Sequence, residues 1–200
     1  MINNLRKFKT PERLEKITRV VKDRQHSLTV VLENIHDPHN VSAIFRTCDA
    51  VGINETSLVY NYEKYPKIGK SSSASAYKWV GKNKFESIDE CYSKLRERGF
   101  KIYASILDKN AVDLYELDLT EKSAIVIGNE HRGISKEAAE LADKTFYIPM
   151  HGMIQSLNVS VAAAVSIYEA LRQRKIKGMY PSKDLPENEI EKNIDEWCDK

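Results

Sequence analysis

The feature that most constrains the fold is an alternation of short apolar runs with segments of helical spacing. Residues 28–32 (LTVVL) form a β-branched run of strand length, and comparable runs follow at 56–60, 101–105, 124–127 and 145–148. Strands that are apolar along their whole length are typical of a parallel sheet covered on both faces. The sequence therefore predicts an α/β fold with helices on both faces of a parallel sheet.

The segments between the apolar runs predict helices. They cover residues 41–51, 87–98, 135–142 and 159–175. Ser87 is a good N-cap, and Gly99 ends the helix that Ser87 begins. Ahead of the first strand, Thr10 and Pro11 start a further helix whose outer face is basic.

Charge is distributed unevenly along the chain. Residues 1–27 contain eight basic and three acidic residues, whereas residues 183–200 contain seven acidic residues and three lysines. We therefore expect a basic N-terminal helical extension (1–27), an α/β core (28–175) and an acidic C-terminal tail (176–200). After Tyr180 that tail has a linker and then a short helix, which contains Ile190, Ile194 and Trp197.

The basic N-terminal helix allows two interpretations. It is either a solvated amphipathic helix packed on the core or a contact surface for a polyanion such as RNA. Its candidate RNA-binding residues are Arg13, Lys16 and Arg19. A second basic region, residues 60–84, has six lysines and one acid, interleaved with Tyr60, Tyr62, Tyr65, Tyr77 and Trp79. This mix suits phosphate contact and base stacking, although packing is the alternative, which we favour for Trp79.

Several classes of protein are excluded. Cys48, Cys91 and Cys198 lie far apart, so there is no CxxC pattern of a metal or redox site, and we expect reduced thiols and no metal. The N-terminus lacks the apolar segment of a signal peptide, and no apolar run approaches the roughly 20 residues of a membrane span. The sequence predicts a cytoplasmic protein with no membrane partner.

Three polar stretches stand where ligands bind in such a fold. Residues 34–40, 128–133 and 149–158 each follow a predicted strand and precede a predicted helix. In a parallel sheet, ligands bind beyond the carboxyl ends of the strands. These stretches are therefore expected to form one site.

Each stretch also has a purely structural explanation. Asn40 could cap the helix at 41–51, and Ser156 or Asn158 could cap the last helix. The G-x4-G spacing at 128–133 lacks the Lys and Ser/Thr of a P-loop, so a tight turn and a ligand loop are equally compatible with it.

Arg46 is the most informative charge in these stretches. It lies among apolar residues of the helix at 41–51, where a guanidinium needs either an anion or a carboxylate partner. Phosphate is the obvious anion for a planar guanidinium. A salt bridge to Glu33 or Glu130 would serve equally well.

The three stretches together resemble the motifs of the SpoU/TrmH family of RNA ribose 2′-O-methyltransferases, in the SPOUT superfamily. The resembling segments are NIHDPHNVSAIFRTCDAVG, IVIGNEHRGIS and IPMHGMIQSLNVSVAAA. One such motif is weak, but three in order with matching spacing are specific. Both ends of the chain look most like the TrmH branch, whose members methylate the ribose of guanosine-18 in the tRNA D loop. Ribosomal RNA or another tRNA position, and a catalytically inactive RNA-binding knot protein, are the alternatives.

The resemblance implies an S-adenosylmethionine-dependent homodimer with a C-terminal trefoil knot, acting on tRNA and not on DNA. The helices at 41–51 and 159–170 are plausible packing surfaces for the dimer. The positions that match the family's catalytic residues are Arg46, Asn40, Glu130, Ser156 and Asn158. The positions that match its cofactor-binding residues are Ser105, Gly128, Ile148, Met150 and Leu157.

Within that resemblance, Arg46 matches the arginine to which the family assigns deprotonation of the ribose 2′-hydroxyl. Because an arginine stays protonated in proteins, anchoring an RNA phosphate and stabilising the developing alkoxide is the alternative. Asn40 would position Arg46 or the RNA, Glu130 would order the site, and Ser156 and Asn158 would support the knot loop. The chain departs from the family at Ser75, where relatives usually have glycine.

Overall fold

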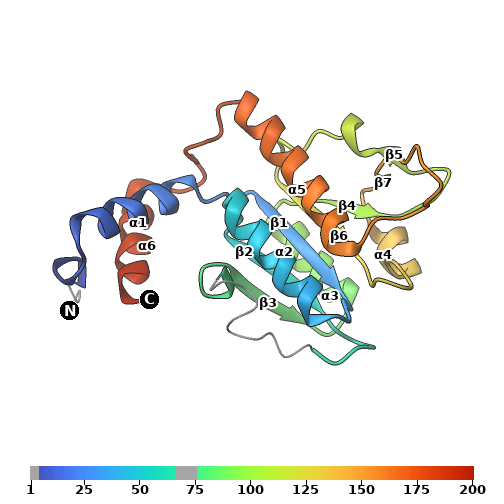
Figure 1. Cartoon of the computed structure of the whole chain (residues 1–200), viewed down its shortest axis with the longest axis horizontal. Helices are drawn as coiled ribbons and strands as arrows, with labels where there is room; N and C mark the ends of the chain where they lie inside the picture. Colours follow the sequence, from blue (N-terminus) through green and yellow to red (C-terminus); the bar gives the residue numbers. More distant parts are fainter. Residues whose placement is uncertain (1–4, 66–75) are drawn as a thin grey trace.

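The computed structural model describes residues 5–65 and 76–200, and its centre is a seven-stranded sheet in the order β3-β2-β1-β6-β4-β7-β5 (Figure 1). Every neighbouring pair of strands is parallel, which confirms the predicted fold class. The strands are β1 (Leu28–Glu33), β2 (Glu55–Val59), β3 (Gly81–Phe85), β4 (Lys101–Ser105), β5 (Val112–Asp113), β6 (Ser123–Ile127) and β7 (Lys144–Tyr147).

The sequence did not predict β3 and β5, which form the two edges of the sheet. β3 reads GKNKF and has a neighbour on one side only, so its lysines remain in contact with solvent. β5 is two residues long. Edge strands carry charge and need no continuous apolar run, so the pattern that marks the central strands is missing from both.

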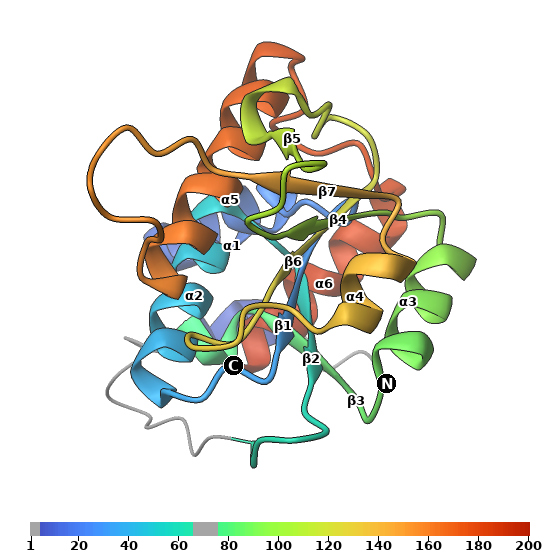
Figure 2. The ribbon, with the colours of Figure 1, turned by 90° about the vertical axis from the view of Figure 1, so that its right-hand side faces the viewer.

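Helices cover both faces of the sheet (Figure 2). One face carries α2 (Pro38–Val51) and α5 (Val159–Ile176), which pack on each other, and the other carries α3 (Ile88–Glu97) and α4 (Lys136–Leu141). Short 3-10 helices are η1 (Leu5–Phe8), η2 (Ala76–Lys78) and η3 (Leu114–Glu116). The backbone N–H of Glu90 donates to Ser87 Oγ (3.1 Å), which confirms the predicted N-cap of α3.

The two terminal helices, α1 (Pro11–Asp23) and α6 (Glu187–Asp199), pack against each other beside the sheet (Figure 1). Their shared core is a separate cluster of buried residues, namely Ile17, Val21, Ile194 and Cys198. The Arg6 guanidinium pairs with Glu191 (2.7 Å) and Asp195 (2.6 Å). Part of the basic and acidic charge at the two ends of the chain is therefore paired within the molecule.

Two tryptophans join this helical pair to the rest of the chain. The rings of Trp79 and Trp197 lie 4.8 Å apart, and the Arg24 guanidinium lies 4.8 Å from the Trp197 ring. Arg24 also pairs with Asp49 on α2. The expectation that Trp79 serves packing is confirmed.

The segment expected to be a linker, residues 181–189, is held against the core, and its last three residues already belong to α6. Tyr180 Oη donates to the Val51 carbonyl (2.9 Å). Asp184 Oδ2 accepts from the backbone N–H groups of His26 (2.8 Å) and Ser27 (2.9 Å) and from the Ser27 hydroxyl. The Asp184 bonds fasten the segment to the start of β1, and the Tyr180 bond fastens the chain just before it to the end of α2.

A buried arginine fixes the far end of α5. The Arg174 side chain is fully buried, and burial lowers its pKa. It donates five hydrogen bonds to neutral acceptors: Gln25 Oε1, Ser27 Oγ and the carbonyls of Ser27, Leu119 and Glu121. Because these acceptors lie just before β1 and β6, Arg174 sets the direction in which α5 runs across the sheet.

Among the residues that the structure describes, no helix is long and apolar enough to cross a membrane.

Candidate active site at the carboxyl ends of the strands

The three predicted loops converge, as expected, at one end of the sheet. Asn40 Nδ2 donates to Glu130 Oε1 (2.9 Å), and Asn158 Nδ2 donates to Asn40 Oδ1 (3.2 Å). The first two loops follow β1 and β6, which are neighbours at the point where the strand order reverses. Such a switch point is where open α/β sheets bind ligands.

Asn40 does not cap α2, so its predicted structural role is wrong. The N-cap is Asp37, whose carboxylate accepts from the backbone N–H of His39 (2.8 Å), and Pro38 takes the first helical position that suits proline. The Asn40 side chain is therefore available to bridge two loops. Asn158, in contrast, caps α5 as expected, because its Oδ1 accepts from the N–H of Ser160 (2.9 Å).

Glu130 joins the loop after β6 to the start of α2. Its carboxylate accepts from the backbone N–H groups of His36 (2.9 Å) and Asp37 (3.1 Å), besides the Asn40 amide. Burial alone would raise the pKa of Glu130, but the hydrogen bonds from Asn40 and the backbone outweigh burial and lower it. The carboxylate therefore holds the loops together at neutral pH, and this contribution is lost as the pH falls through the lowered pKa.

Neither proposed carboxylate partner pairs with Arg46. Glu33 accepts from the backbone N–H of Ser135 (2.9 Å) instead, and burial raises its pKa, while Glu130 is held as described above. Arg46 is exposed, and no acidic side chain among residues 5–65 and 76–200 forms an ion pair with it. The salt-bridge interpretation is wrong, and the guanidinium is open to an external anion.

A cavity of about 400 Å³ lies beyond the ends of β4, β6 and β7. Its volume is in the range of small-molecule sites, about 300–1,000 Å³. It is lined by all five residues predicted to bind a cofactor, namely Ser105, Gly128, Ile148, Met150 and Leu157. Glu130 and Ser156 also line it, whereas Asn40 and Asn158 lie beside it and Arg46 is outside the lining.

The G-x4-G stretch is a tight turn that forms one wall of the cavity. The backbone groups of Asn129 and Gly133 bond to each other in both directions (2.9 and 2.8 Å). A Cβ atom added at Gly128 would collide with the backbone of Gly133 and Ile134. Gly128 is thus required by the chain's own turn, and through that turn it shapes the cavity.

Residues 27–168 match the family model described as the SpoU rRNA Methylase family. The chain belongs to this family.

Similar proteins of the SpoU family extend the match to nearly the whole chain. A tRNA (guanosine(18)-2'-O)-methyltransferase of Thermus thermophilus is 44% identical over 192 residues, covering 96% of this chain and 98% of that protein. The crystal structure of the Aquifex aeolicus TrmH/SpoU tRNA modifying enzyme has 42% identity and a TM-score of 0.87, covering 94% of this chain and 95% of that one. The Streptomyces viridochromogenes SpoU methyltransferase AviRb, solved with AdoMet, has 26% identity and a TM-score of 0.68, covering 77% of this chain and 62% of that one.

In this SpoU-family chain, a further residue connects the loops around the site, and it was not predicted from the sequence. Asn34, just after β1, has a left-handed backbone (φ 52°) and is buried. Its Oδ1 accepts the N–H groups of Asn61, Tyr62 and Glu63 (3.1–3.2 Å), and its carbonyl accepts from Asn129 Nδ2 (2.7 Å). Asparagine is enriched among left-handed residues, but nothing local in the sequence names these partners.

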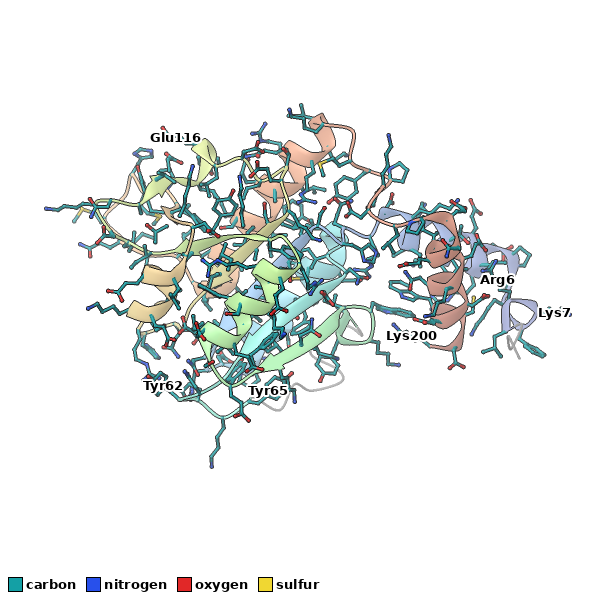
Figure 3. All side chains as sticks on the ribbon, turned by 180° about the vertical axis from the view of Figure 1, so that it is seen from behind. Arg6, Lys7, Tyr62, Tyr65, Glu116 and Lys200 are labelled. Atoms are coloured by element: carbon teal, nitrogen blue, oxygen red, sulfur yellow. The ribbon has the colours of Figure 1, made fainter. Side chains whose placement is uncertain are left out.

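The aromatic residues of the second basic region divide between packing and exposure. Tyr60 donates to the Ile35 carbonyl (3.1 Å), and its ring packs edge-on to Tyr65 with centroids 5.3 Å apart. Tyr77 packs on Phe45 of α2. Tyr62 is 74% exposed (Figure 3) and is the tyrosine of this group open to a base. Ser75, where the chain departs from the glycine usual in the family, lies outside the described residues.

Proposed function

We propose that this protein methylates the 2′-hydroxyl of guanosine-18 in the tRNA D loop, with S-adenosylmethionine as methyl donor. The observation that carries the proposal is the Asn40–Glu130–Asn158 network beside a cavity with all five expected cofactor residues. The 44% identity to a tRNA (guanosine(18)-2'-O)-methyltransferase includes both terminal extensions, which supports tRNA over ribosomal RNA as substrate.

The cavity suits S-adenosylmethionine in size and chemistry. Ile148, Met150 and Leu157 offer apolar contact for an adenine ring, and the Gly128 turn lines the same cavity, where its backbone groups would hydrogen-bond to the edge of the ring. When bound, the cofactor supplies an activated methyl group. The chain's own part is to hold the cofactor, exclude water and align the ribose oxygen, and alignment can supply much of the rate.

Arg46 is the residue to which we assign the RNA side of the reaction. Its exposed guanidinium lacks an acidic partner among the described residues, which suits it to bind an RNA phosphate and to stabilise the developing alkoxide. Asn40 and Glu130 fix the start of the helix that carries Arg46. Ser156 and Asn158 support the loop that closes the cavity.

The test is incubation of the protein with unmodified tRNA and labelled S-adenosylmethionine, followed by mapping of the methylated nucleotide. Methylation at guanosine-18 is expected. Label at another tRNA position or only in ribosomal RNA would change the substrate and keep the chemistry. Label in no RNA would contradict the proposal and favour an inactive RNA-binding protein.

The protein is further proposed to act as a homodimer through the outer face of α5. Val161 and Tyr168 are 46% and 50% exposed, and with Val165 they form an apolar stripe at helical spacing. Tyr168→Glu is expected to yield monomers in light scattering, because it places a charge in the stripe. Tyr115→Glu, at an exposed tyrosine of η3, should leave the mass unchanged. A dimeric Tyr168→Glu variant would contradict this interface.

The α1–α6 pair (extensions 1–27 and 176–200) is proposed to hold tRNA beside the core, 28–175. Arg13, Lys16 and Arg19 are exposed on α1, and the described part of the chain offers none of them an ion-pair partner. Changing all three to alanine should weaken tRNA binding and reduce its salt slope by about 0.7–0.9 per lost phosphate contact. Lys94→Ala, at a cation paired with Glu97 (2.8 Å), is the control. An unchanged slope would return α1 to a packing role.

We also infer a trefoil knot and a cytoplasmic location. β7 is an inner strand of the sheet. The chain that follows β7 returns to α2, where Asn158 bonds to Asn40, before α5 begins. A return of the chain past an earlier segment is the type of crossing that a knot needs. Pulling on both ends of a single molecule should leave a contour shorter than an unknotted chain.

The three free cysteines and the tRNA substrate suit the cytoplasm, which cell fractionation would test.

A further inference from the structure

A guanidinium at the cavity wall is held by a carboxylate from a neighbouring loop. Arg132, in the turn after β6, lines the cavity, and its Nη2 lies 2.5 Å from Glu63 Oε1. The other carboxylate oxygen of Glu63 lies 3.1 Å from His36 Nδ1. The side chain of Arg132 is 60% exposed and that of Glu63 is 25% exposed. Neither residue takes part in the network of Asn40, Glu130 and Asn158.

The positions of both partners are fixed by the fold. The Glu63 backbone is held by Asn34 Oδ1 (3.2 Å), and the turn that carries Arg132 is held by the bond from Asn129 Nδ2 to the Asn34 carbonyl (2.7 Å). Asn129 Oδ1 also accepts from the backbone N–H of Arg132 (3.2 Å). Asn34 therefore anchors both loops, and the ion pair is built into the site.

We propose that Arg132 binds a phosphate of the RNA substrate. In the protein without RNA, the ion pair with Glu63 keeps the Arg132 guanidinium at the edge of the cavity. This proposal rests on the proposed function. An exposed ion pair contributes little free energy, so it opens readily. A phosphate offers the guanidinium a bidentate partner of the same charge as Glu63. The RNA backbone and Glu63 therefore compete for one cation beside the bound cofactor.

Because Glu63 and the RNA phosphate compete for Arg132, substitutions of Glu63 and of Arg132 should change RNA affinity in opposite directions. Arg132→Ala removes a charge-assisted contact and should weaken tRNA binding about tenfold. Glu63→Gln removes the competitor and should tighten binding by up to about fivefold, since the exposed pair that it breaks is weak. Glu63→Gln leaves the backbone N–H that bonds to Asn34, so the loop keeps its anchor.

The experiment measures the tRNA dissociation constant at several salt concentrations for wild type, the two single variants and the double variant. In the Arg132→Ala background, Glu63→Gln should no longer tighten binding, and the salt slope should fall by about 0.7–0.9. Glu97→Gln, which breaks the Lys94 pair on α3, makes the same change in net charge and is the control. Equal tightening by Glu97→Gln, or tightening that persists without Arg132, would overturn the proposal.

Methylation of guanosine-18 by the wild type is measured in the same samples. If the wild type methylates guanosine-18 but Glu63→Gln does not tighten binding, the phosphate site is refuted and the function stands. If the opposite effects appear without methylation, the function is refuted and the phosphate site stands.

Discussion

Replacing Arg46 with alanine is expected to lower kcat by about 10²–10³-fold, the range for loss of one donor that stabilises negative charge developing on the reacting oxygen. Binding of S-adenosylmethionine should remain close to wild type, because Arg46 is outside the cavity lining. The fold should also persist, since the side chain is exposed and α2 keeps its Asp37 cap. Single-turnover methylation of unmodified tRNA measures the first effect, and calorimetry measures the second.

Arg46→Lys tests the type of contact that Arg46 makes. Lysine keeps the charge but loses the planar fork that holds a phosphate by two bonds, so we expect turnover to fall here too. Turnover near wild type would exclude both bidentate phosphate binding and a role as base. Lys94→Ala, at an exposed cation of α3, should leave turnover unchanged and serves as the matched control.

The general position of the active site could be predicted because a parallel sheet has only one carboxyl end. β1 (LTVVLE) and β6 (SAIVI) are mostly apolar and buried along their whole length, so their apolar runs identify them from the sequence. Once these strands are assigned, the loops after them must meet. The contacts between Asn40, Glu130 and Asn158 follow from that geometry, although no spacing rule names these side chains as partners.

Two kinds of feature could not be predicted from the sequence: the choice between neighbouring N-cap residues, and contacts between residues far apart in the chain. Asn40 is a good N-cap residue by type, but Asp37 followed by Pro38 starts α2 earlier, so the Asn40 amide bonds to Glu130 and Asn158 instead of capping the helix. Glu63 and Arg132 are 69 residues apart, and their pairing depends on the left-handed turn at Asn34. Such contacts arise from tertiary structure, and hydrophobic periodicity contains no information about them.

Replacing Gly128 with alanine is expected to abolish most cofactor binding. The added Cβ would collide with backbone atoms of Gly133 and Ile134, so the turn closed by Asn129 and Gly133 must open. Overpacking of this kind costs about 1–3 kcal/mol, which corresponds to about 5–150-fold weaker binding if that strain is relieved in the wall of the cavity. Calorimetric titration with S-adenosylmethionine measures this loss.

Gly133→Ala separates the collision from ordinary backbone strain in the same turn. Gly133 has φ +68° and no atom within 4 Å of an added Cβ, so alanine there should lower stability by about 1–2 kcal/mol while the cavity keeps its shape. Thermal unfolding should therefore shift for both variants, but cofactor binding should be lost only for Gly128→Ala. Equal loss of binding in both would mean that the rigidity of the turn, and not the close approach at Gly128, determines the site. Tight binding by Gly128→Ala would remove this turn from the cofactor site altogether.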